Sequence, residues 1–262
     1  MAMNPGASIV RATRDRHPAP ERIGSVRSWS VTHTGSFRQV NQDRCLARDD
    51  LGVWLVADGA GGHQSGGAAA QAVVEEFARL ETGDEAIVQE CRRALQRTHA
   101  LLRGSAEGEN RRAMGLTTAV VLVLCEDEVI CHWAGDSRAY RFRDGRLTLL
   151  TRDHSLVQEL VDLGRISPHE AGDHPQRNII TRAVGADCET LDISSISARV
   201  EPGDLYLLCS DGLPAALPEA EIAAAFALSP ALIAHALVDA ALANRARDNV
   251  TALVISMGSA DR

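Results

Sequence analysis

Apolar and polar positions recur along the chain in runs that predict both strands and helices. Short β-branched runs bounded by turn residues predict strands, and apolar residues three to four positions apart predict helices. The expected strands are Arg27–Thr34, Val53–Ala57, Thr117–Cys125, Val129–Ala134, Arg138–Arg143, Leu147–Leu150, Asp204–Cys209 and Thr251–Met257. The expected helices are Ala68–Leu80, Glu85–Leu102, His154–Leu163, Glu219–Phe226 and Pro230–Asn244.

The order of these elements indicates an α+β fold, with helices outside mostly antiparallel sheets. A parallel sheet would need a regular alternation of strand and helix, which this order lacks. No linker-like segment interrupts residues 27–257, so we expect one domain there. Residues 1–26 are expected to form a flexible N-terminal tail, and residues 258–262 a short C-terminal tail.

The basic residues limit the chemistry that the chain can perform, because all 27 of them are arginine and none is lysine. A P-loop needs a lysine on the phosphates, a protein kinase needs its strand lysine, and pyridoxal enzymes need a Schiff-base lysine. The composition therefore excludes these three classes.

Charge and hydropathy narrow the expected partners and location. The net charge of −8 argues against nucleic-acid binding through bulk charge. The longest apolar stretch, Thr117–Cys125, is too short to span a membrane, and the N-terminus carries no apolar signal region. The six cysteines form no C-x-x-C pair, which indicates reduced thiols. We therefore expect a cytoplasmic protein that binds neither membrane nor nucleic acid.

Four aspartates stand at the ends of predicted strands. Asp58, Asp136 and Asp211 each follow an apolar run, and Asp248 comes just before the last strand. Strands of a common sheet can bring their ends together, so these carboxylates could converge, although a single Asp-Gly after a strand is more often a turn. Converging like charges need a cation, and oxygen ligands without Cys or His favour Mg²⁺ or Mn²⁺.

Two other motifs are near misses. Gly59-Ala60-Gly61-Gly62 follows a strand, but Gln64 stands where a dinucleotide-binding loop needs its third glycine. Gly135-Asp136-Ser137-Arg138-Ala139 lacks the last glycine of a serine-hydrolase elbow, so Ser137 is interpreted as structural.

Eight segments in order carry a resemblance to a known family. They are RQVNQD (38–43), VADGAGGHQSGG (56–67), GLTTAV (115–120), AGDSRAYRFRDG (134–145), LTRDHSL (150–156), IITRAVG (179–185), LLCSDGL (207–213) and RDNVTALV (247–254). In this order they resemble the metal-dependent protein phosphatases of type 2C, most of all the compact bacterial single-domain members. The resemblance covers about residues 27–257.

The resemblance implies a four-layer α-β-β-α sandwich with two mostly antiparallel central sheets and a metal centre at one end of them. By its motifs, Asp58 bridges two Mn²⁺ or Mg²⁺ ions and the Gly59 carbonyl joins the second ion. The remaining implied roles are Asp211 and Asp248 as further ligands of the first ion, Asp136 as a ligand of a third and weaker ion, Asp43 as an outer acidic residue near the metal waters, and Arg38 as the residue that grips the substrate phosphate.

The implied activity is hydrolysis of phosphoserine and phosphothreonine by direct attack of a metal-bridging hydroxide. Partners would be phosphorylated proteins and a cognate Ser/Thr kinase whose action the enzyme reverses, and a monomer is expected. Two positions depart from the family. Gln42 replaces a common Glu, and Ala60 stands where some relatives have a general-acid His. His63 is the nearest local candidate for that acid, although a loop role is the commoner one for such a histidine.

Those departures leave an alternative open, in which the chain is a weak or silent family member that binds phosphoproteins as a regulator. Retention of Arg38 and of all four strand-end aspartates argues against it. Residues 152–184 correspond to the family's variable flap beside the metal site. His154, His169 and His174 of this flap show no paired ligand spacing, so we expect them to face solvent.

Overall fold

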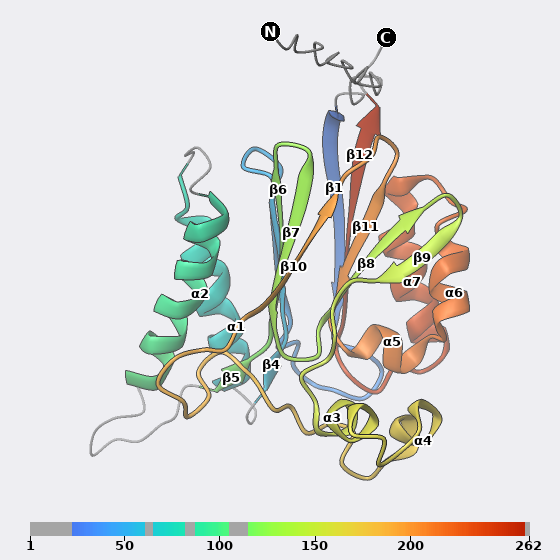
Figure 1. Cartoon of the computed structure of the whole chain (residues 1–262). Coiled ribbons are helices and arrows are strands. Elements are labelled where there is room, and N and C mark those ends of the chain that lie inside the picture. The colour runs from blue at the N-terminus through green and yellow to red at the C-terminus, as the bar shows by residue number, and fades with distance from the viewer. Residues whose placement is uncertain (1–22, 61–64, 82–86, 105–114, 260–262) are drawn as a thin grey trace, which may run out of the picture.

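Two stacked sheets form the centre of the molecule (Figure 1). The computed structural model describes residues 23–60, 65–81, 87–104 and 115–259. Sheet I has the order β1 (Ile23–His33), β12 (Val250–Ser259), β11 (Leu205–Cys209), β8 (Arg138–Arg143) and β9 (Arg146–Leu149). Sheet II has the order β10 (Ser194–Arg199), β7 (Glu128–Ala134), β6 (Ala119–Cys125), β3 (Val53–Ala57) and β2 (Arg44–Arg48). A short pair, β4 (Gly59–Ala60) and β5 (Leu116–Thr117), lies beyond the end of β3.

Helices cover the outer face of each sheet. Helices α1 (Ser65–Ala78) and α2 (Ile87–Gly104) lie on sheet II, and α5 (Gly212–Ala216), α6 (Glu219–Ala225) and α7 (Pro230–Ala243) lie on sheet I (Figure 1). Two short helices, α3 (Leu156–Asp162) and α4 (Pro168–Asp173), lie at one end of the sandwich. The layer order α-β-β-α and the antiparallel pairing confirm the predicted fold class.

Alternation along the strands produces three separate apolar layers. In β3, Leu55 faces the helices on sheet II, whereas Trp54 and Val56 face the space between the two sheets. In β11, Leu207 faces the helices on sheet I, and Leu208 meets the central layer. Each central strand is therefore buried on both faces, which explains why these runs are almost continuously apolar.

Most predicted elements are confirmed, but their ends and one strand differ. Strand β1 starts at Ile23 and β12 ends at Ser259, so the paired strands extend beyond the expected 27–257 limits. The predicted strand Thr117–Cys125 is interrupted at Thr118, whose backbone N–H donates to the Asp58 carbonyl at 2.8 Å. There the chain stops pairing with β3 and pairs with β4 instead.

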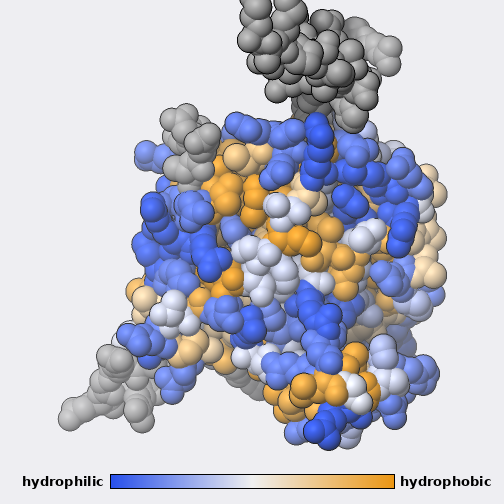
Figure 2. Space-filling view, viewed as in Figure 1, coloured by the Kyte–Doolittle hydropathy of each residue, from blue (hydrophilic) through white to orange (hydrophobic). Residues whose placement is uncertain are grey.

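The described helices and the molecular surface bear on whether the chain has a membrane span. Among the described residues, no helix combines the length and the hydrophobicity that a membrane span requires. The face in Figure 2 is mainly hydrophilic over the outer helices, and hydrophobic residues gather near α3 and α4. None of the six cysteines is in a disulfide bond, and of these only Cys188 is exposed.

Candidate metal centre and substrate cleft

The strand-end aspartates meet at one end of the sandwich, and they come from both sheets. Asp58 follows β3 and Asp136 follows β7, which run in the same direction within sheet II. Asp211 follows β11 of sheet I, and Asp248 precedes the antiparallel strand β12, so both lie at the same end. The four carboxylates therefore converge across the gap between two sheets and not along the edge of one common sheet.

Burial and mutual repulsion disturb the ionisation of this group. Burial raises the pKa of Asp58 well above its usual value, and Asp43, Asp211 and Asp136 raise it further. Burial likewise raises the pKa of Asp136 to about 8, with contributions from Asp211 and Asp153. The pKa of Asp211 is also raised, first by burial and then by Asp248. Such shifts mark carboxylates that need a neutralising partner.

Asp43 lies beneath the group in a buried polar network. Its side chain is 1% exposed, and its Oδ2 accepts hydrogen bonds from Ser210 Oγ and Thr251 Oγ1, both at 2.7 Å. Burial raises the pKa of Asp43 to about 6, although these two hydrogen bonds act in the opposite direction. One oxygen is thus held by the scaffold, which fixes the direction of the other.

Arg38 lies at the mouth of the group and binds one of its carboxylates. Its Nη2 donates to Asp248 Oδ2 at 2.6 Å. This hydrogen bond is the main cause that raises the pKa of Arg38, and burial acts in the opposite direction. The negative charges of Asp248, Asp58 and Asp211 raise it further. The Arg38 side chain is 55% exposed, so a ligand can reach it.

Asn249 holds the loop that carries Arg38. Its Oδ1 accepts from the Gln42 backbone N–H at 2.8 Å, and its Nδ2 donates to the carbonyls of Thr34 and Val40. This role of Asn249 was not predicted, although the residue directly follows Asp248 at the start of a strand. Gly35 adds close packing, since its φ is +80° and a Cβ there would lie 2.0 Å from the Asp248 carbonyl oxygen.

Gly59 is packed too tightly for a side chain. A Cβ at this position would lie 2.2 Å from the Gly66 carbonyl oxygen at the start of α1. The close approach of β4 to α1 therefore requires glycine at position 59. It places the peptide after Asp58 beside the carboxylate group.

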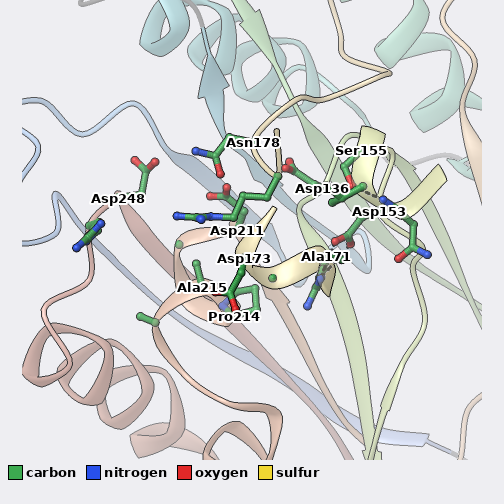
Figure 3. A pocket seen from close by; sticks show the side chains of 18 of the residues that line it. Asp136, Asp153, Ser155, Ala171, Asp173, Asn178, Asp211, Pro214, Ala215 and Asp248 are labelled. Carbon is green, nitrogen blue, oxygen red and sulfur yellow. Dashed lines mark hydrogen bonds and ion pairs between the residues drawn. The ribbon is translucent and has the colours of Figure 1, made fainter. Parts of the chain in front are cut away.

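A cleft of about 1100 Å³ opens from this group. Figure 3 shows Asp248, Asp211 and Asp136 side by side along it, with Ala171 and Asp173 of α4 near Pro214 and Ala215 of α5. The flap, residues 152–184, thus forms one wall, and the segments that follow β11 and α7 supply the others.

The chemistry of the donors fits hard divalent cations. Oδ1 of Asp43, of Asp136 and of Asp211 is buried and has no hydrogen-bond partner among the described residues. Orphaned carboxylate oxygens of this kind suit Mg²⁺ or Mn²⁺. The arrangement is more open than a closed coordination shell, since no three His, Cys, Asp or Glu side chains of the described segments form one. Asp248, which Arg38 holds, would exchange the guanidinium for a cation.

Two histidine predictions have different outcomes. His63 lies outside the described residues. His154 was expected to face solvent, and this was wrong: it is 8% exposed and stacks on Trp133, with 5.9 Å between ring centroids. Its Nδ1 accepts from the Gly135 backbone N–H, and the His154 backbone N–H donates to the Gly135 carbonyl. The flap base is thereby fastened to the residue before Asp136.

Asp153 is a cleft residue that the sequence analysis did not single out. It receives a bidentate contact from Arg138, with Nη2 to Oδ2 at 2.6 Å and Nε to Oδ1 at 2.9 Å. Arg138 is thus engaged inside the protein. Only the tertiary structure shows this pair, since 15 residues separate its members.

Comparison with known proteins gives the family. The family model described as protein phosphatase 2C matches residues 33–244. The chain is 36% identical over 224 residues to the serine/threonine protein phosphatase PstP of Mycobacterium tuberculosis, covering 84% of this chain and 43% of that relative. It is 33% identical over 237 residues to the serine/threonine phosphatase Stp of Listeria monocytogenes, covering 86% of this chain and 93% of the relative.

Solved structures agree. PppA, a regulatory component of the type VI secretion system in Pseudomonas aeruginosa, matches with a TM-score of 0.82 and 37% identity, covering 89% of this chain and 98% of that one. The catalytic domain of PstP in complex with two manganese ions matches with a TM-score of 0.79 and 31% identity, covering 89% and 99%. The resemblance found in the sequence is confirmed, and the chain belongs to the protein phosphatase 2C family.

Proposed function

We propose that this chain is a protein serine/threonine phosphatase that depends on Mn²⁺ or Mg²⁺. The observation that carries the proposal is the group of buried carboxylates with orphaned oxygens, opening beside Arg38 into a cleft. The names of the relatives support the same activity, although the chain spans only 43% of the length of PstP. A silent phosphoprotein binder is not favoured, since it would have no need to retain every one of these carboxylates.

The family's motifs suggest which residues would hold the metal ions. We propose that Asp58 would serve two divalent ions, that Asp211 and Asp248 would complete the first, that the Gly59 carbonyl would join the second, and that Asp136 would serve a third. Asp43 would orient metal-bound waters through its free Oδ1. Two divalent ions bound here would supply Lewis acidity and lower the pKa of a shared water.

The residues of the chain would then perform the remaining work. Arg38, released from Asp248, would bind two phosphoryl oxygens with its planar fork. The flap and the segment after β11 would hold the peptide on either side of the phosphorylated residue. His63 stays a candidate for the acid that protonates the leaving Ser or Thr oxygen. The expected products are inorganic phosphate and the free hydroxyl.

The setting is proposed more coarsely. We expect a single domain from about residue 23 to residue 259, acting as a monomer in the cytoplasm on phosphoproteins made by a cognate Ser/Thr kinase. Six cysteines without a disulfide bond support a reducing compartment.

The test is phosphate release from p-nitrophenyl phosphate and from a phosphothreonine peptide. Turnover should appear with Mn²⁺ and stop with EDTA. If calorimetry shows bound Mn²⁺ and neither substrate is hydrolysed, the enzyme proposal is wrong and the regulatory alternative replaces it.

A further inference from the structure

The cleft is larger than one phosphorylated side chain needs. Its volume of about 1100 Å³ exceeds the upper end of the range of about 300–1,000 Å³ that is common for small-ligand sites. Beyond Arg38 and the aspartates it extends past the flap and α5 to the turn after α7. Residues on either side of a phosphorylated serine or threonine can therefore lie inside it.

The distribution of charge along this extension is uneven. Arg138 and Arg152 of the lining are paired with Asp153 and Asp162. Three further arginines line the same cleft without a carboxylate partner among the described residues, and we call them the arginine rim: Arg177, Arg245 and Arg247. Outside the metal group, Asp173 is the one lining carboxylate of the described segments that no arginine neutralises. The rim is thus locally positive in a chain whose net charge is −8.

Arg245 is held in place before any ligand arrives. Its guanidinium carbon lies 5.6 Å from the centroid of the Phe37 ring, within the range of a cation–π contact. Phe37 directly precedes Arg38, and the Ser36 N–H donates to the Ala246 carbonyl at 2.9 Å, so the two turns are joined. Arg245 therefore lies beside the loop that carries the phosphate-binding arginine.

The backbone at Arg245 does not favour arginine. Its φ is +56°, the left-handed region where glycine or asparagine is the usual residue after a helix. An arginine there is explained more readily by its side chain than by the turn. The guanidinium fork suits carboxylates in two-point contacts.

We propose that the arginine rim binds acidic residues beside the phosphorylated serine or threonine, so that the enzyme selects acidic segments of its protein substrates. The inference rests on the proposed function and deepens it. Each exposed contact of this kind is weak, so the selection comes from two or three acting together. It should weaken as salt rises.

The experiment compares two phosphothreonine peptides that differ only in flanking Glu or Gln. At low ionic strength the wild type should show about a ten-fold higher kcat/KM for the Glu peptide. R245G should reduce this ratio by about two- to five-fold, and the triple variant R177S/R245G/R247S should bring it near one. R165S is the matched control, because Arg165 is an exposed flap arginine outside the cleft lining, and it should keep the wild-type ratio.

Binding of the same two peptides to a D211N variant, read by fluorescence anisotropy, decides the proposal without turnover. The proposal is supported if D211N binds the Glu peptide more tightly than the Gln peptide, and if this difference disappears when the three rim substitutions are added. The proposal is overturned if the wild type has equal kcat/KM for the two peptides, or if D211N with an intact rim binds them equally. It is also overturned if R165S loses the preference for the Glu peptide as much as the triple variant does. Absence of hydrolysis of either peptide and of p-nitrophenyl phosphate refutes the proposed function, while anisotropy still decides the role of the rim.

Discussion

At the scale of single residues, Asp211 lies among the strand-end aspartates of both sheets. Its Oδ1 is buried without a partner, and Asp248 and Asp58 both act on its ionisation. D211N keeps the shape but removes a charge, so we expect Mn²⁺-dependent hydrolysis of p-nitrophenyl phosphate to fall by more than about 100-fold. In EDTA the variant should melt at or above the wild-type temperature, because one repelling charge is gone. Unchanged turnover would refute the ligand assignment.

The control for that experiment is D239N on the exposed side of α7. It removes the same charge far from the cleft lining, so its turnover should match the wild type. Equal losses in D211N and D239N would point to net charge in place of metal ligation.

The left-handed backbone of Arg245 and its contact with Phe37 have opposite effects on the free energy of unfolding. Glycine relieves about 1 kcal/mol of left-handed strain, and loss of the Phe37 contact costs about 0.5 kcal/mol. R245G should therefore unfold in urea with a free energy at or slightly above that of the wild type. R247G lies outside the positive-φ positions and should lose about 0.5–1 kcal/mol. The reverse ranking of the two variants would show that the Arg245 backbone carries no strain.

At the scale of elements, the long apolar strands and amphipathic helices could be predicted from the sequence, and the edge and short elements could not. Strand β10, SSISAR, is an exposed edge strand with little apolar alternation, so its sequence pattern does not predict a strand. Its backbone is held in the sheet by antiparallel pairing with β7. Helix α5 has five residues, too few for a recognisable period. The break at Thr118 depends on Asp58, 60 residues away, so no local pattern contains it.

The cluster of aspartates was likewise predicted in part from local sequence. Position directly after or directly before an apolar run identified the four strand-end aspartates, because strand ends are local features. Asn249, Asp153 and the burial of His154 arise from contacts between distant segments, which spacing does not encode.

The flap base yields an element-scale prediction with a pH signature. Burial, and then Arg182, lowers the pKa of His154 to about 4, below its usual value of 6.5. Because the folded state prefers the neutral ring, the stability that His154 contributes is full above pH 6.5 and is lost as the pH falls towards 4. H154N keeps an acceptor for Gly135 but loses the ring, so it should be about 1–3 kcal/mol less stable at pH 7.5. This gap should narrow by pH 5.

Urea unfolding in EDTA at both pH values measures the gap. H169N is the control, because His169 is an exposed flap residue, and it should follow the wild type at both pH values. A gap that widens in acid would contradict the buried neutral ring.

At the scale of the whole molecule, both sheets place negatively charged aspartates at the same end of the sandwich, where these charges repel one another. Sheet II brings Asp58 and Asp136, sheet I brings Asp211 and Asp248, and Asp43 lies beneath them. Without cations this end of the sandwich holds several carboxylates at one place, and with cations the same end becomes a link between the sheets. Fold stability and metal binding should therefore be coupled.

That coupling predicts how stability depends on pH. The pKa of Asp43 is raised to about 6 and that of Asp136 to about 8, each first by burial. Because these folded-state values exceed those of the unfolded chain, the stabilising effect of protonation is full at low pH and is lost as the pH rises through 6 and then 8. In EDTA the free energy of unfolding should fall from pH 7 to 8.5, by up to about 1.4 kcal/mol per pH unit for one extra bound proton, and the melting temperature should fall with it. This window lies above the range in which His154 acts.

Saturating Mn²⁺ should remove most of that slope, since the cation replaces the proton as the neutralising charge. The difference in melting temperature between Mn²⁺ and EDTA should therefore grow from pH 7 to 8.5, as read by thermal scans in matched buffers. D136N should flatten the slope in EDTA, because it deletes the carboxyl with a pKa of about 8. A metal-free protein that grows more stable over this window would show that the carboxylates do not repel one another across the two sheets.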